Sequence, residues 1–65
     1  MIENYSSIFT PGVFVINPDM KYEWGIGQIQ SSINNVITVN FENVGKKTIN
    51  LSKINLEIVN INATS

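Results

Sequence analysis

The chain has 65 residues, of which 43% are hydrophobic and 14% charged, and its formal net charge is −1. A chain this short encloses a single core, and this one is too apolar for a disordered polypeptide. It contains no cysteine and no histidine, which excludes disulfides, thiolate nucleophiles and imidazole bases, and its four lysines and five carboxylates give no overall basic footprint for nucleic acid.

The termini are polar and are predicted to lie outside the folded domain. Residues 1–9 are expected to form a loose lead, residues 10–59 the domain, and residues 60–65 a tail. Within the lead, Ile8 and Phe9 are expected to pack back onto the domain. No basic leader is present and no apolar run is long enough to span a membrane, so we expect a cytoplasmic protein without membrane association.

The first half of the domain predicts two strands. The turn at Thr10-Pro11-Gly12 opens a strand at residues 13–17, which are rich in β-branched and aromatic side chains. Asn17-Pro18-Asp19 ends that strand, and residues 20–23 are expected to continue as a loop. The second strand is predicted over residues 24–32.

Two glycines, Gly25 and Gly27, lie inside the second predicted strand. Interior glycine indicates a bulge, a bend or a close backbone approach, and we expect a bend that lets the strand serve both sides of a barrel. The pair Asn34-Asn35 follows that strand. Asparagine tolerates positive φ, so this pair predicts a tight hairpin.

The third strand carries the clearest alternation in the chain. Over residues 36–42, Ile37, Val39 and Phe41 fall on one face and polar residues on the other. This pattern predicts a half-buried antiparallel strand. The turn after it places Gly45 where a positive φ is expected.

Three short elements complete the prediction: a strand at residues 46–50, a single 3₁₀ turn at 51–54 and a closing strand at 56–59. No segment has a helical apolar period over 11 or more residues. Five short strands with tight turns predict an all-β fold, a small closed barrel.

A series of sequence blocks then points to known proteins. In chain order they are Thr10-Pro11-Gly12, Val15, Pro18, Trp24-Gly25-Ile26-Gly27-Gln28-Ile29-Gln30-Ser31, Ile37-Thr38-Val39-Asn40-Phe41-Glu42, Gly45-Lys46-Lys47 and Leu56-Glu57. Over about residues 10–59, the chain resembles a family of short bacterial proteins, common in alphaproteobacteria, known as a domain of unknown function. More distantly, it is similar to the Tudor-like module at the C-terminus of UvrD/PcrA-type DNA helicases.

The resemblance implies a five-stranded SH3/Tudor-like barrel with one 3₁₀ turn before the last strand. It also implies a binding role, because the helicase module is associated with contacting RNA polymerase. Such modules usually begin their first strand with Gly-Asp-Arg-Val, whereas this chain has Gly12-Val13-Phe14-Val15. An apolar segment therefore replaces a charged patch.

The sequence contains no recognisable arrangement of catalytic residues. The carboxylates are scattered over different predicted elements, at Glu3, Asp19, Glu23, Glu42 and Glu57. This spacing predicts no carboxylate pair for acid–base catalysis. Gly25-Ile26-Gly27 lacks the third glycine of a dinucleotide-binding turn, and Gly45-Lys46-Lys47-Thr48 lacks the earlier glycine of a phosphate-binding loop. We expect no enzyme activity, no cofactor and no metal.

The favoured hypothesis is a protein-binding module in the transcription or DNA-repair machinery. Its predicted contact residues are Phe14, Tyr22, Trp24, Ile26 and Lys46. Aromatic residues are enriched at interface hot spots. The sequence leaves open whether the Trp24 and Phe14 side chains belong to the core or to the contact surface. The glycines Gly12, Gly25, Gly27 and Gly45 are assigned structural roles at turns and bends.

Two alternatives remain at this stage. Weak nucleic-acid binding would use Lys46, Lys47 and Lys53 with an aromatic stacking platform. On the fourth strand Lys47 shares the side of inward-facing Ile49 and Lys46 faces outward. Self-association would use an exposed apolar strand.

Overall fold

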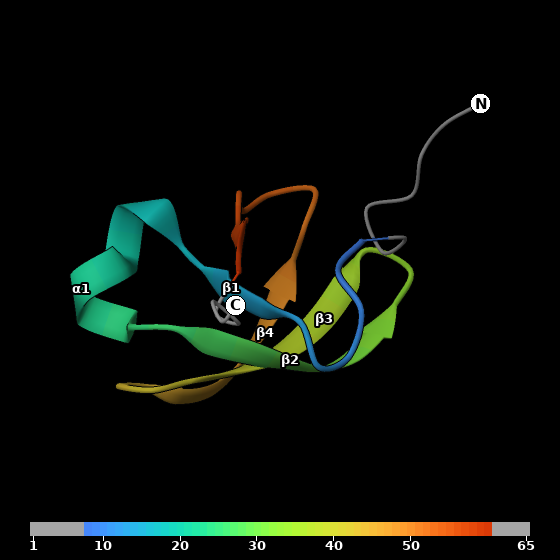
Figure 1. The fold of residues 1–65 in the computed structure, drawn as a ribbon. Helices are drawn as coiled ribbons and strands as arrows, with labels where there is room; N and C mark the ends of the chain where they lie inside the picture. Colours follow the sequence, from blue (N-terminus) through green and yellow to red (C-terminus); the bar gives the residue numbers. More distant parts are fainter. Residues whose placement is uncertain (1–7, 61–65) are drawn as a thin grey trace.

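The computed structural model describes residues 8–60, so most of the predicted lead and tail lie outside the described residues. Its elements are β1 (Phe14–Ile16), a 3₁₀ helix (Pro18–Met20), α1 (Lys21–Trp24), β2 (Gly27–Ile33), β3 (Val36–Phe41), β4 (Gly45–Asn50) and β5 (Glu57–Val59). The five strands form one antiparallel sheet in the order β4-β3-β2-β1-β5 (Figure 1). The all-β prediction is confirmed.

The sheet is a meander whose last strand returns to the first. Strands β1 to β4 pair consecutively, and β5 pairs with β1, with Phe14 opposite Val59. Strands β4 and β5 are therefore the two edges, and the sheet is not closed. The predicted closed barrel is therefore not confirmed.

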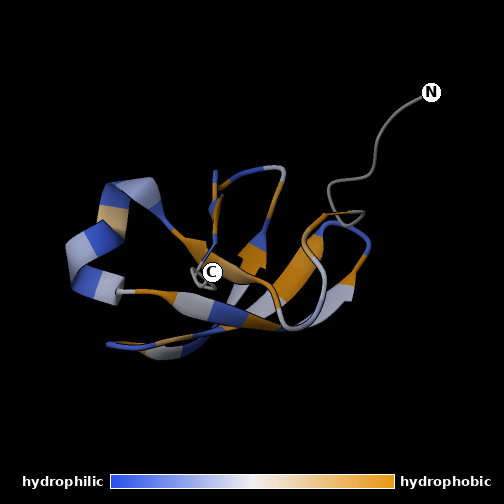
Figure 2. Ribbon diagram, in the orientation of Figure 1, coloured by the Kyte–Doolittle hydropathy of each residue, from blue (hydrophilic) through white to orange (hydrophobic). Residues whose placement is uncertain are grey.

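The core lies on one face of the sheet. Its buried apolar side chains are Phe9, Val15, Ile29, Ile37, Val39, Phe41, Ile49, Leu51 and Leu56. The alternation predicted for the third strand is confirmed, because Ile37, Val39 and Phe41 are at most 2% exposed. Figure 2 shows the hydrophobic stretches on β1 and β3 beside the more hydrophilic α1. Of the two residues expected to pack back, Phe9 joins the core and Ile8 is exposed.

The segment between β1 and β2 is helical, which corrects the predicted loop at residues 20–23. Asn17 begins the 3₁₀ helix, because its side-chain oxygen accepts the Asp19 N–H at 3.0 Å and Pro18 supplies a preset φ. One turn of α-helix follows and ends at Gly25, whose φ is +78°. Trp24 therefore belongs to α1, and the prediction that it begins the second strand is wrong.

Gly27 begins β2 and faces the core. A Cβ atom at Gly27 would lie only 2.6 Å from Cδ1 of Phe41, so the position requires the close approach that glycine permits. The irregularity in β2 lies farther along, where the register with β3 shifts between Ile29 and Ser31. After this shift Ser32, opposite Ile37, faces the core.

The remaining turns follow local backbone chemistry. In the β2–β3 hairpin Asn34 has a φ of +57°, as the Asn34-Asn35 pair predicts. After β4, the N–H groups of Lys53 and Ile54 both donate to the Asn50 carbonyl, at 2.9 and 3.0 Å. The bond from Lys53 to Asn50 spans three residues, as in the single 3₁₀ turn expected here. The 3₁₀ helix Pro18–Met20, before β2, is a separate element that was not predicted.

Candidate outer-face binding site

A depression of about 470 Å³ lies on the outer face of the sheet, opposite the core. It follows a row of register partners that crosses the strands, from Phe14 on β1 through Gln28 on β2 to Asn40 on β3. The next partner in this row is Lys46 on the edge strand β4. Antiparallel partners point to the same face, so these side chains stand side by side.

The walls of the depression combine apolar and polar side chains. Phe14 and Ile26 are half-buried and supply the outward apolar contacts. The amides of Gln28, Asn40 and Asn43 supply polar ones. Among the lining residues, Glu42 is the single ionisable one. The site is therefore amphipathic, with one fixed negative group.

Glu42 and Asn43 connect the α1 end of the molecule to the β3–β4 turn. The Ile26 N–H donates to Oε1 of Glu42 at 3.0 Å, and the Asn43 side-chain amide donates to the Tyr22 carbonyl at 3.4 Å. Backbone bonds from the N–H groups of Glu42 and Asn43 to the carbonyls of Ile26 and Trp24, at 2.9 and 3.0 Å, join the same segments. These bonds fix the orientation of this wall of the depression.

Gly25 makes room for this arrangement. A Cβ atom at Gly25 would lie 2.8 Å from Oε1 of Glu42, and its φ of +78° is unfavourable for other residues. The carboxylate therefore occupies space that a side chain at position 25 would fill. The remaining predicted turn glycines, Gly12 and Gly45, have φ values of +95° and +78° with open space around them.

Trp24 packs on the core side, away from the depression. Its ring centroid lies 5.0 Å from that of Phe41 at an angle of 60°, and Nζ of Lys47 lies 4.9 Å from its centroid. Tyr22, by contrast, is 85% exposed on α1. Of the predicted contact residues, the structure thus brings Phe14 and Ile26 together in the depression. Lys46 stands beside it, and Trp24 and Tyr22 lie outside its lining.

Sequence reasoning missed the polar members of this site. Gln28 and Asn40 alternate with buried residues on β2 and β3, so the period-two pattern marks both as outward-facing. Glu42 falls on the polar face of the strand predicted at residues 36–42, whereas the structure places it in the turn after β3. Asn43, in the same turn, has no sequence signal. Their place in the site depends on contacts with a segment 16 to 21 residues earlier in the chain.

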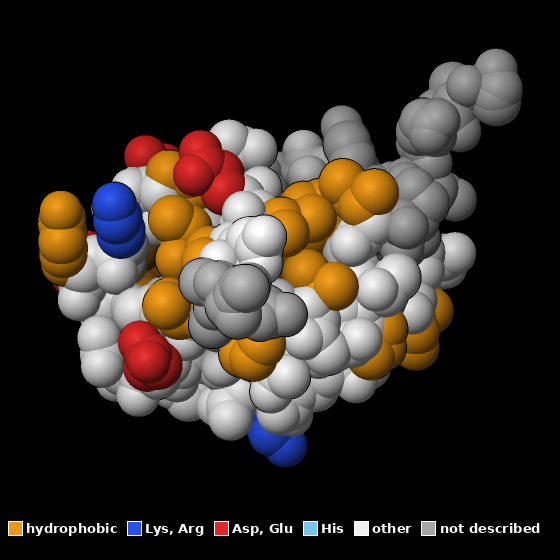
Figure 3. Space-filling model, in the orientation of Figure 1, with side chains coloured by type: hydrophobic (Ala, Val, Ile, Leu, Met, Phe, Trp, Pro, Cys, Tyr) orange, Lys and Arg blue, Asp and Glu red, His pale blue; other side chains and the backbone are white. Residues whose placement is uncertain are grey.

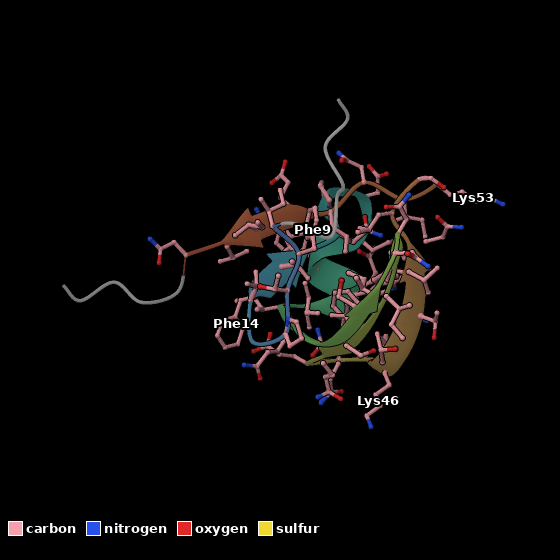
Figure 4. All side chains as sticks on the ribbon, turned by 90° about the vertical axis from the view of Figure 1, so that its right-hand side faces the viewer. Phe9, Phe14, Lys46 and Lys53 are labelled. Carbon is pink, nitrogen blue, oxygen red and sulfur yellow. The ribbon has the colours of Figure 1, made fainter. Side chains whose placement is uncertain are left out.

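The lysines do not gather into one patch. Lys46 is exposed on the outer face, whereas Lys47 is half-buried on the core side with its ammonium over the Trp24 ring. Lys53 lies in the turn after β4, and Figure 4 shows it well apart from Lys46, at the upper right of the view, with Lys46 at the bottom. On the face shown in Figure 3, charged side chains are few, and hydrophobic side chains gather in groups at the upper middle and the left of the view.

The described part of the chain offers no cluster suited to a metal ion. Within residues 8–60, no group of three acidic side chains lies close enough together to hold a metal ion. None of the helices in this part is long and apolar enough to cross a bilayer. The chemistry available at the depression is therefore apolar contact, hydrogen bonding by amides and a single carboxylate.

The fold and the site define a small antiparallel all-β domain with one amphipathic depression on its outer face. The chain belongs to the DUF3553 family, described as a protein of unknown function, whose model matches residues 9–59. This confirms the predicted membership of a domain-of-unknown-function family. No curated protein and no solved structure matches the chain.

Proposed function

We propose that this chain is a non-catalytic module that binds a protein partner through its outer-face depression. The observation that carries the proposal is that Phe14 on β1 and Ile26 just before β2 line the same depression, surrounded by amides and by Glu42. An apolar centre with a polar rim is the usual composition of a protein–protein contact. The sheet holds these side chains in place, so little ordering entropy opposes binding.

The distribution of charge favours a protein over a nucleic acid. A phosphate backbone is bound by several cations on one surface. Here Lys46 is the single lysine beside the depression, Lys47 lies on the core side, and the depression itself holds a carboxylate. Weak nucleic-acid binding therefore has less support than protein binding.

The fold proposal is a partly open SH3/Tudor-like barrel. The return of β5 to pair with β1 supports it, because this connection brings the two ends of the meander around one core. The similarity to the Tudor-like module of UvrD/PcrA-type helicases supports a cytoplasmic partner in the transcription or DNA-repair machinery, such as RNA polymerase.

Capture from a native lysate tests the proposal. The variant Phe14→Ser removes the aromatic wall of the depression, and Ile33→Ser is the matched control because Ile33 is 69% exposed at the far end of β2. Trp24→Ala is a poor probe, since its ring packs against Phe41. Both variants are first checked for native circular dichroism.

The proposal predicts that wild type and Ile33→Ser capture the same proteins and that Phe14→Ser loses them. Equal recovery by all three forms, or recovery of none, contradicts it. Capture that disappears after nuclease treatment assigns the surface to nucleic acid instead. A dimer in sedimentation that Phe14→Ser abolishes assigns it to self-association.

A further inference from the structure

Two amides and one carboxylate of the depression present hydrogen-bond acceptors to the site, while the Asn40 amide can both donate and accept. The Gln28 amide nitrogen donates to the Gly12 carbonyl at 3.3 Å, and the Asn43 amide nitrogen donates to the Tyr22 carbonyl at 3.4 Å. Neither Gly12 nor Tyr22 lines the depression. Both amides are thus oriented with their nitrogens toward backbone partners outside the site. Their oxygens remain as acceptors.

The Glu42 carboxylate adds the strongest acceptor to this set. Its Oε1 accepts the Ile26 N–H, which fixes the side chain, and the second oxygen remains available. An ionised carboxylate only accepts hydrogen bonds. Two of the lysines are placed elsewhere, since Lys47 lies over Trp24 and Lys21 places its ammonium 5.6 Å from the Tyr22 centroid. Lys46 stands beside the depression on β4, as the register partner of Asn40.

We infer that the depression receives a cationic side chain, arginine or lysine, from the protein partner. Guanidinium and ammonium groups only donate hydrogen bonds, so they complement a site that mainly accepts. Their charge pairs with the carboxylate of Glu42, and their methylene stems suit the apolar walls formed by Phe14 and Ile26. This inference rests on the proposed function and specifies the chemistry that the surface recognises.

Nuclear magnetic resonance titration of the full chain tests the inference with defined probes. The probes are acetylated and amidated pentapeptides with arginine, lysine, glutamine or glutamate at the centre and alanine elsewhere. The arginine or lysine peptide is expected to shift the amide signals of Ile26, Gln28 and Asn43, and the relative affinities of the two peptides distinguish guanidinium from ammonium. Equal shifts from the glutamine or glutamate peptide overturn the inference, as does the absence of shifts at millimolar concentration.

A charge-matched pair of variants makes the titration specific. Glu42→Gln keeps an oxygen for the Ile26 N–H and removes the charge, whereas Glu57→Gln removes the same charge from exposed β5. Glu42→Gln is expected to weaken binding about two- to five-fold, the usual effect of one exposed ion pair. Glu57→Gln is expected to leave it unchanged. Equal effects of the two variants overturn the inference.

The two levels of the proposal fail separately. If Phe14→Ser abolishes capture of a protein partner while Glu42→Gln retains full affinity for it, the binding function stands and the cationic side chain is excluded. If the cationic peptides bind but capture does not depend on Phe14, the binding function fails although the depression accepts cations.

Discussion

Substitution of Gly27 by alanine tests the packing of the core against β2. The added Cβ atom would overlap Cγ1 of Val39 and would lie 2.6 Å from Cδ1 and 2.8 Å from Cε1 of Phe41, well inside ordinary contact distance. The Phe41 ring would have to move by about 1 Å to restore a normal carbon–carbon separation of about 3.5 Å. Phe41 is 2% exposed and packs against Trp24, so this movement displaces further core atoms.

The expected cost is that of overpacking a core, about 1–3 kcal/mol. In a domain of this size, each kcal/mol lowers the melting temperature by about 4–8 °C, and total stability is only a few kcal/mol. Urea unfolding followed by tryptophan fluorescence measures the loss. Gly45→Ala is the comparison without a steric clash, because a Cβ there meets nothing within 4 Å; it is expected to cost about 1–2 kcal/mol from its φ of +78° alone and to show no coupling to Phe41.

A double-mutant cycle identifies the cause. Phe41→Leu removes the ring and Val39→Ala removes Cγ1, the two groups that the new methyl group would contact. Gly27→Ala combined with either substitution is therefore expected to be more stable than the sum of the single effects predicts. If Gly27→Ala lies within 0.5 kcal/mol of wild type, or if both combinations are additive, the close approach at Gly27 does not explain the glycine.

Five further substitutions, in three tests, have defined outcomes. Asn34→Gly should be nearly neutral and Asn34→Ala should cost about 1 kcal/mol in urea unfolding, because φ is +57° there; equal costs would refute the turn assignment. Ser32→Ala should be neutral or stabilising in the same assay, since the buried Ser32 Oγ has no hydrogen-bond partner among the described residues; a loss above about 1 kcal/mol would mean that it has one. Lys47→Met should lower stability by no more than about 1 kcal/mol, whereas Trp24→Ala should lower it by about 2 kcal/mol or more. The reason is that the cation–π contact is weaker than the apolar packing of the Trp24 ring. Calorimetry that shows the reverse order would contradict this ranking.

The strands were predictable where local pattern and burial agree. The alternation of Ile37, Val39 and Phe41 fixes the inner face of β3, and Asn34 marks the hairpin before it. Lys46 and Lys47 likewise divide between the outer and inner faces as the period-two pattern requires. In these cases a short stretch of sequence carries the whole signal.

The helical segment was missed because four residues cannot display a helical period. A signal was nevertheless present, since Asn17 followed by Pro18 is a helix-start pattern. The prediction for Trp24 failed because an aromatic residue next to an apolar run is typical of a strand. In the structure Trp24 instead closes the core from α1, against Phe41.

The candidate site was predicted only in part, because it depends on long-range pairing. Phe14 and Ile26 were selected for their apolar character, and the register of β1, β2 and β3 brings them together with Gln28 and Asn40. The shift in register between Ile29 and Ser31 also follows from pairing, and no local motif marks it. Whether the sheet closes is decided in the same way, by contacts between strands distant in sequence.

Site-specific photo-crosslinking in living cells tests the central claim, a protein partner at the outer-face depression, most directly. A photoreactive residue in place of Asn40 stands within the depression, and one in place of Lys53 lies outside its lining and well apart from Lys46. If a protein partner binds at the depression, the photoreactive residue at position 40 gives a discrete protein adduct and the one at position 53 does not. Equal adducts from both positions, or none from position 40, would contradict it.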